Sequence, residues 1–146
     1  MSAEQTTRYS AESLLSRPVA AYLRARGYDY VAREIPFYDR SIDLYAFCEE
    51  TNWSLAVELK LTRWRKAFTQ ALLYQLCADV AVVALPAREA ARVDMQALAE
   101  HGVGLLAVLN DGSCEERLAP RPPGVLRDDY KTECKLLMRR KSRWRR

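Results

Sequence analysis

Three ionisable residues in the first half of the chain have types and spacing that could support hydrolytic chemistry. Glu58 is followed two positions later by Lys60, and Asp43 precedes both by a short stretch of sequence. Residues i and i+2 of a β-strand share a face, so Glu58 and Lys60 would point the same way if this segment is a strand. A lysine beside a metal-bound carboxylate can hold or deprotonate a water molecule and stabilise developing negative charge.

Two turns determine how these residues meet. With the turn of residues 49–52 centred on its midpoint, Asp43 lies opposite Glu58 on adjacent strands. With the turn of residues 36–40 centred between its third and fourth residues, Glu34 lies opposite Asp43. A register shifted by one residue would instead send these side chains to opposite faces.

The predicted row of carboxylates needs a counter-charge. Directly opposed residues have Cβ atoms about 4.5–5.5 Å apart, and like charges at that distance are destabilising. Oxygen ligands of this kind suit a hard divalent cation. The sequence therefore predicts a divalent metal site that is formed by Glu34, Asp43 and Glu58.

The elements that would position this row alternate between helices and strands. Two continuous apolar strands separated by helices indicate a partly parallel sheet whose faces are both covered. We therefore predict an α/β fold, a three-layer sandwich with a mixed central sheet of four to six strands flanked by helices. Pro18 falls inside the first helix, so that segment could instead divide into a turn and a shorter helix. The expected elements are a helix at 10–26, strands at 28–35, 41–48 and 53–60, a helix at 65–78, a strand at 79–85, a helix at 88–101, a strand at 103–109, a short strand ending at Leu118 and a basic C-terminal helix or tail.

These residues resemble the PD-(D/E)xK, or restriction-endonuclease-like, nuclease superfamily. The resemblance consists of Ile42-Asp43, then Val57-Glu58-Leu59-Lys60 on the next strand, then Gln70 on the following helix, and it runs from about residue 22 to residue 86. Ile42 stands where the motif has proline. The superfamily's core, a four-stranded mixed sheet with flanking helices, agrees with the predicted fold.

The resemblance implies a role for each residue of the motif. Asp43 and Glu58 would bind Mg²⁺ (or Mn²⁺) with help from the Leu59 carbonyl, and Lys60 would position the attacking water. Glu34 would be a second-metal or outer ligand, and Gln70 would orient groups around the site. Some relatives place the extra glutamate on the first helix, so Glu12 competes with Glu34, and we favour Glu34.

Other interpretations of the same residues remain open. The acid-x-Lys pattern also occurs at residues 129–131 and 133–135, without a facing strand acid. Glu58 and Lys60 could belong to a solvated strand face, and Gln70 could pair with Tyr74 as an ordinary helix i, i+4 contact. Trp64 could be a packed aromatic residue or could stack on a base at the rim of the site.

Charge is concentrated at the C-terminus. The chain has 23 basic and 19 acidic residues, and seven of the basic ones lie in residues 135–146, which contain no acid. The rest of the chain therefore has 16 basic and 19 acidic residues, so the net positive charge belongs to the tail and suits a polyanion. We divide the chain into a nuclease-like domain at 1–120 and a Pro-rich connector with a basic helix or tail at 121–146. The predicted nucleic-acid contacts are Arg63, Trp64, Arg65, Lys66, Arg139, Arg140, Lys141, Arg143, Trp144, Arg145 and Arg146.

The leading hypothesis is a Mg²⁺-dependent nuclease, with endonuclease favoured over exonuclease and DNA over RNA. The alternative is a catalytically inactive nucleic-acid-binding module on the same fold; a protein that binds anionic membranes through its tail is disfavoured by the compact α/β body. A single histidine and four scattered cysteines argue against a zinc site or a histidine-dependent nucleophile and favour reduced, apolar cysteines. We expect a cytoplasmic protein with no membrane partner, and we also weigh a homodimer.

Overall fold

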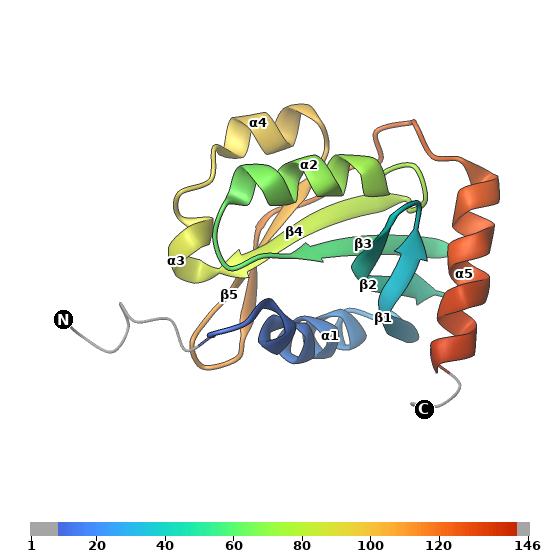
Figure 1. Cartoon of the computed structure of the whole chain (residues 1–146), viewed down its shortest axis with the longest axis horizontal. Helices are drawn as coiled ribbons and strands as arrows, with labels where there is room; N and C mark the ends of the chain where they lie inside the picture. Colours follow the sequence, from blue (N-terminus) through green and yellow to red (C-terminus); the bar gives the residue numbers. More distant parts are fainter. Residues whose placement is uncertain (1–8, 143–146) are drawn as a thin grey trace.

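Six strands form one mixed sheet in a computed structural model that describes residues 9–142 (Figure 1). The strands follow chain order from one edge of the sheet to the other. Within these residues, no helix combines the length and the apolar character needed to cross a bilayer. The elements are a 3₁₀ turn at Glu12–Leu15, α1 at Ser16–Ala25, β1 at Tyr30–Phe37, β2 at Arg40–Cys48, β3 at Trp53–Leu59, α2 at Trp64–Tyr74, β4 at Val80–Pro86, α3 at Ala87–Ala90, α4 at Met95–Glu100, β5 at Gly104–Val108, β6 at Cys114–Leu118 and α5 at Asp128–Ser142.

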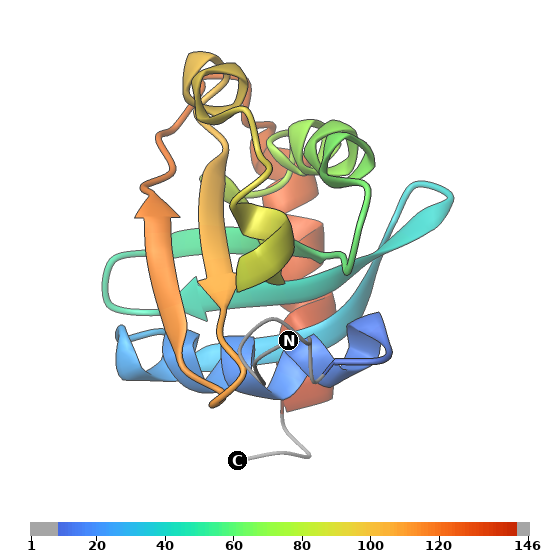
Figure 2. The ribbon, with the colours of Figure 1, turned by 90° about the vertical axis from the view of Figure 1, so that its left-hand side faces the viewer.

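The sheet separates two layers of helices, which confirms the predicted α/β sandwich. In Figure 1, α1 lies below the sheet, α2 and α4 lie above it and α3 lies at its left-hand end, and Figure 2 shows the same layers from the side. Leu15, Val19 and Leu23 pack from the α1 side against one face of the sheet. Ala67, Ala71 and Tyr74 of α2 belong to the larger core on the other face, together with residues of α5.

The sheet changes direction at β3. The pairs β1–β2 and β2–β3 are antiparallel, as expected for a meander, whereas β3–β4 and β4–β5 are parallel and the edge strand β6 is antiparallel to β5. All residues of β4 and β5 are buried, which is typical of parallel strands covered on both faces. The carboxyl end of β3 is thus an interior strand end, next to β2 and β4.

Two predicted helices divide, and each division has a local cause. Pro18 occupies the first turn of α1, where its missing N–H has no helical partner to lose, and residues 12–15 form a separate 3₁₀ turn. The segment expected as one helix at 88–101 contains the short α3 and α4 instead. Asp94 ends the gap between them, since its side chain accepts hydrogen bonds from the N–H groups of Gln96 and Ala97 at the start of α4.

The C-terminal helix is part of the same folded unit. Cys134 and Met138 of α5 are buried in the larger core, and α5 packs along β1. The sequence assigned residues 121–146 to a Pro-rich connector and a basic helix or tail; the structure has a helix there through residue 142, and this helix packs against the sheet. All four cysteines are free, and Cys77 and Cys134 are buried in this core, as expected for apolar thiols.

Candidate active site

Asp43 and Glu58 lie side by side where β2 and β3 run together. The register pairs Leu44 with Val57, as the turn positions predicted, and the next step along the two strands brings Asp43 opposite Glu58. The two carboxyl groups are close enough to share a hydrogen bond when one of them is protonated. Glu58 is only 9% exposed. The structure therefore places two acids in direct contact in a largely buried position, and we call them the carboxylate pair.

Each member of the carboxylate pair also accepts a hydrogen bond from the fold. The hydroxyl of Tyr74, on α2, donates to Glu58 Oε1 at 2.6 Å. The backbone N–H of Leu59 donates to Asp43 Oδ2 at 2.8 Å. These donors hold the two carboxyl groups in place, so the geometry of the pair is determined by β3 and α2 together.

Burial and mutual repulsion disfavour two negative charges at this position. Burial is the largest cause that raises the pKa of Glu58, to about 7, and the charge of Asp43 is the next. Burial also raises the pKa of Asp43, although the Leu59 N–H partly offsets it. Two adjacent carboxyl groups share a proton under these conditions. Full ionisation of the pair requires a positive partner.

The predicted third acid of the row does not join the pair. Arg33 pairs with Leu44 and Ile35 with Ile42, as predicted, but the pair that would join Glu34 to Asp43 is missing between them. Glu34 has a left-handed backbone with φ of 57° and is exposed. A non-glycine residue rarely adopts this conformation, and here it interrupts the regular pairing of β1. The assignment of Glu34 as a ligand is therefore not supported by the geometry.

Glu12 takes the neighbouring position instead. Its Oε2 lies 3.6 Å from the ammonium Nζ of Lys60 and accepts a hydrogen bond from the N–H of Leu61 at 3.5 Å. The charge of Glu12 also contributes to the raised pKa of Asp43. Lys60 follows the last residue of β3, and its backbone N–H donates to the carbonyl of Ala84. The site thus combines the carboxylate pair with a lysine and a glutamate from the first helical segment.

The site residues that the sequence predicted on or beside α2 differ in burial and in contacts. Gln70 lies one turn before Tyr74 on α2 and is half-buried, and its side chain makes no hydrogen bond within residues 9–142. Trp64 is only 7% exposed and packs in the larger core, which favours the packed alternative over stacking on a base. The backbone N–H of Trp64 donates to Glu89 Oε2 at 3.1 Å, and this hydrogen bond joins the start of α2 to α3. The neighbouring basic residues Arg63, Arg65 and Lys66 are exposed, as a contact with nucleic acid requires.

Two of the basic C-terminal residues, Arg139 and Lys141, already contact other parts of the protein. Arg139 lies 3.0 Å from Glu49 Oε1, and the ammonium of Lys141 donates to the carbonyl oxygens of Arg33 and Glu34. Arg140 is exposed. The remaining predicted contacts Arg143, Trp144, Arg145 and Arg146 lie outside the described residues.

The carboxylates of the site fit a magnesium ion that takes its remaining ligands from water and the substrate. Among residues 9–142, no group of three or more acidic, histidine or cysteine side chains is arranged to hold a metal ion. Mg²⁺ is commonly bound through one or two carboxylates, with waters and substrate phosphates as the other ligands. Asp43 and Glu58 supply two hard carboxylate groups that form no ion pair within residues 9–142. Leu59, whose carbonyl the resemblance adds as a ligand, follows Glu58 in the chain and donates its N–H to Asp43. The residues present therefore fit a magnesium site in which the protein supplies two carboxylates, and water and substrate phosphates supply the other ligands.

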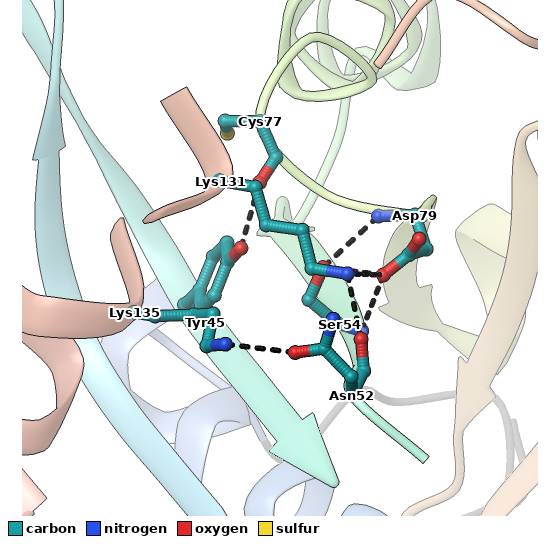
Figure 3. Close-up of polar contacts among 7 residues, drawn as sticks. All are labelled: Tyr45, Asn52, Ser54, Cys77, Asp79, Lys131 and Lys135. Atoms are coloured by element: carbon teal, nitrogen blue, oxygen red, sulfur yellow. Dashed lines mark hydrogen bonds and ion pairs between the residues drawn. The ribbon is translucent and has the colours of Figure 1, made fainter. Parts of the chain in front are cut away.

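A second buried polar cluster, not anticipated from the sequence, lies between β3, β4 and α5 (Figure 3). The ammonium of Lys131 donates to Asp79 Oδ2 at 2.7 Å and to the carbonyl of Asn52 at 2.6 Å. The same Asp79 oxygen accepts hydrogen bonds from the N–H and hydroxyl of Ser54. We call Asn52, Ser54, Asp79 and Lys131 the Asp79–Lys131 cluster. Lys131 belongs to one of the acid-x-Lys matches beyond residue 120, and here it anchors α5 to the sheet.

Comparison with known proteins identifies a solved structure of similar fold. A scan against protein-family models finds no match. No curated protein matches the chain. Among solved structures, the chain is similar to the SPO1766 protein of unknown function from Silicibacter pomeroyi, with a TM-score of 0.64 and 19% sequence identity, over 92% of this chain and 85% of that one. At this identity the similarity shows the fold alone, a mixed sheet with flanking helices.

Proposed function

We propose that the protein is a Mg²⁺-dependent nuclease that hydrolyses phosphodiester bonds in DNA. The observation that carries the proposal is the carboxylate pair: Asp43 and Glu58 in contact, largely buried, with the pKa of Glu58 raised to about 7. Ionised acids are not kept this close for stability alone, because like charges at that distance repel. A pair of this kind is expected where a cation is to be bound.

Asp43 and Glu58 would hold the ion through their carboxylate oxygens, with the carbonyl of Leu59 as a third donor. The chemistry that such an ion supplies when bound is polarisation of the scissile phosphate and activation of the attacking water. Tyr74 keeps Glu58 in position through its 2.6 Å hydrogen bond. Because Glu58 must lose its proton to bind a cation, activity is expected to rise as the pH passes about 7.

Lys60 would stabilise the transition state. Its ammonium lies at the carboxyl end of β3, beside the carboxylate pair, and its charge lowers the pKa of both members. A fixed positive charge there can neutralise the charge that develops on the phosphate oxygens. Glu12, 3.6 Å from Lys60 Nζ, would orient this ammonium. The four free cysteines agree with action in the reducing cytoplasm, which we include in the proposal.

A second candidate is a nucleic-acid-binding module without catalysis. The observation that favours it is that Asp43 and Glu58 each already accept a hydrogen bond from a protein donor, so the pair is stable as a partly protonated unit. Under this alternative the exposed Arg63, Arg65 and Lys66 would bind phosphates and the carboxylate pair would stay protonated.

Cleavage assays separate the two candidates. Supercoiled plasmid and end-labelled linear, branched and single-stranded oligonucleotides are incubated with the purified protein in Mg²⁺, in Mn²⁺ and in excess EDTA. A nuclease of the proposed kind cuts in both metals and stops in EDTA. Binding without any cut in either metal supports the binding module, and cleavage that persists in EDTA excludes the metal mechanism.

A further inference from the structure

We propose that a groove between α1 and the sheet binds the phosphate backbone of a single nucleic-acid strand. This inference deepens the proposed function, on which it rests, by naming the form of the substrate and its path to the site. The groove has a volume of about 920 Å³ and is lined by the first helical segments, β1, β2 and the turn between β5 and β6. Three arginines line it, namely Arg17 and Arg24 of α1 and Arg33 of β1.

In the part of the chain that the structure describes, the arginines of the groove have no acidic partner. Within residues 9–142, Arg17, Arg24 and Arg33 form no ion pair, and the side chains of Arg17 and Arg24 are exposed. Asp111, at the turn between β5 and β6, is the one acid lining the groove in the described part of the chain, and it accepts hydrogen bonds from Ser113. Guanidinium groups that the fold leaves unpaired suit phosphate groups, to which they bind through two parallel hydrogen bonds.

The spacing of the arginines follows a nucleic-acid strand. Arg17 and Arg24 are seven residues apart on one helix, so they lie on the same face about 10 Å apart along its axis. At the duplex rise of about 3.4 Å per nucleotide this distance spans about three nucleotides of one strand, and it spans fewer nucleotides of a more extended single strand. Arg33 stands across the groove on the edge strand β1. Phosphates of a strand in the groove would thus meet positive charge from both walls.

The remaining lining favours a single strand over a duplex. Leu14, which is 49% exposed, gives the groove an apolar surface beside its arginines, and the buried Val31 and Leu44 lie at its base. An apolar surface suits the sugars and unpaired bases of a single strand, whereas a duplex turns mainly its phosphates outward. The arginines would bind the phosphates of one strand, and the apolar surface would contact its sugars and bases.

One end of the groove meets the candidate active site. Ser13 lines the groove, and the preceding residue, Glu12, contacts Lys60. Leu44 also lines it, whereas the side chain of the preceding residue, Asp43, points to the opposite face of the sheet, because successive side chains of a strand alternate. At the β1 wall, Lys141 is bound to the carbonyl oxygen of Arg33, which adds a further positive charge. A strand that follows α1 would therefore come beside Glu12 and Lys60, at the end of β3 that also carries the carboxylate pair.

Binding can be measured without any catalysis. A fluorescent twelve-nucleotide single strand and the corresponding duplex are titrated in EDTA, at several salt concentrations, with the wild type and with the triple variant Arg17→Gln, Arg24→Gln and Arg33→Gln. The matched control removes the same charge at exposed arginines that pair with acids, through Arg92→Gln, Arg117→Gln and Arg127→Gln. A separate variant, Ala21→Glu, places a negative charge in the groove wall, and circular dichroism verifies that every variant is folded.

The groove variant is expected to lose most of its affinity for the single strand. Each phosphate contact on a single strand contributes about 0.7 to the salt slope, so the loss of three contacts reduces the slope by about 2 and weakens binding about a hundredfold in 0.1 M salt. Ala21→Glu should weaken single-strand binding in the same direction, and the matched control should change it little. Equal loss in the control, unchanged binding by the groove variant, or equal competition by polyglutamate would overturn the proposal.

These outcomes are independent of the nuclease proposal. If the wild type binds the single strand through the groove but never cuts it in Mg²⁺, the nuclease proposal fails and the groove stands. If the wild type cuts DNA and the groove variant binds and cuts as the wild type does, the groove fails and the nuclease proposal stands. A duplex bound more tightly than the single strand through the same arginines would contradict the assigned form of the substrate.

Discussion

The two buried polar clusters use the same residue types in opposite ways. In the Asp79–Lys131 cluster one carboxylate meets one ammonium at 2.7 Å, and Ser54 supplies further donors to the same oxygen. In the carboxylate pair two acids meet each other, and the nearby ammonium of Lys60 lies 3.6 Å from a third acid, Glu12. The first cluster is electrostatically complete and joins α5 to the sheet. The second forms no ion pair of its own among residues 9–142, and the proposed cation would supply the missing positive charge.

The largest expected effect comes from removing the acid of each cluster in turn. Asp79→Ala leaves the ammonium of Lys131 buried without its carboxylate, which is expected to lower the free energy of unfolding by about 3–5 kcal/mol. Asp43→Ala removes one of two like charges, so the free energy of unfolding should stay within about 1 kcal/mol of the wild type, or rise, at pH 8. Urea unfolding of both variants measures the difference. Equal destabilisation by the two substitutions would end the distinction between the clusters.

The pH dependence of stability sharpens the same contrast. The pKa of Glu58 is raised from 4.5 in an unfolded chain to about 7 by burial and by Asp43. The folded state therefore binds the additional proton between these values, so this stabilisation is present below pH 4.5 and is lost as the pH rises through about 7. The loss amounts to roughly 3 kcal/mol. In Glu58→Gln, which keeps an acceptor for Tyr74, this contribution should vanish.

Thermal or urea unfolding from pH 5 to pH 8 measures this effect as a difference between wild type and Glu58→Gln. Other groups titrate in both proteins and cancel in that difference. The prediction is that the variant gains stability relative to the wild type as the pH rises. Parallel curves would mean that Glu58 is ionised in the folded protein throughout this range.

Lys60 is expected to act on rate rather than on binding. Lys60→Met should lower the single-turnover cleavage rate in Mg²⁺ by about a hundredfold, the usual effect of removing one charge that stabilises a transition state. The affinity for uncleaved DNA, measured in EDTA, should change less than about fivefold. Losses of equal size in rate and affinity would make Lys60 a phosphate-binding residue instead.

The smallest expected effects concern the two glutamates that compete for the third acidic position. Glu12→Gln removes the charge beside Lys60 and should lower the cleavage rate about tenfold, which is typical of a residue that positions another. Glu34→Gln should leave the rate unchanged, because Glu34 is exposed and is not paired with Asp43. Cleavage rates in Mg²⁺ and Mn²⁺ compare the two variants. A slow Glu34→Gln with a normal Glu12→Gln would restore the assignment made from sequence.

The sequence predicted the carboxylate pair because its position depends on local information. Turn residues and alternating apolar residues determine the strand register, and that register brings Asp43 to Glu58. The division of the first helix near Pro18 and the α/β fold class could be predicted for the same reason. The bounds of β2 and β3 agree with expectation to within one residue at each end.

The acids around the pair could not be predicted because they depend on backbone strain and tertiary packing. Nothing in the residue type of Glu34 indicates its left-handed backbone. Glu12 reaches Lys60 only because the first helical segment crosses beside the end of β3. Lys131 looked like a spurious acid-x-Lys match, although a lysine among the apolar residues of a helix is a signal for a buried ion pair. The burial of Trp64 likewise follows from how α2 meets α3.

Single-turnover cleavage of a labelled single strand in Mg²⁺, with protein in excess, tests the central claim most directly. The wild type is compared at pH 8 with Asp43→Asn and Glu58→Gln, which keep the shape of the pair, and with Glu34→Gln as the matched control outside it. The account predicts that both substitutions in the pair lower the rate by about a thousandfold or more while the control cuts at the wild-type rate. Cleavage by Asp43→Asn at the wild-type rate, or no Mg²⁺-dependent cleavage by the wild type, would contradict it.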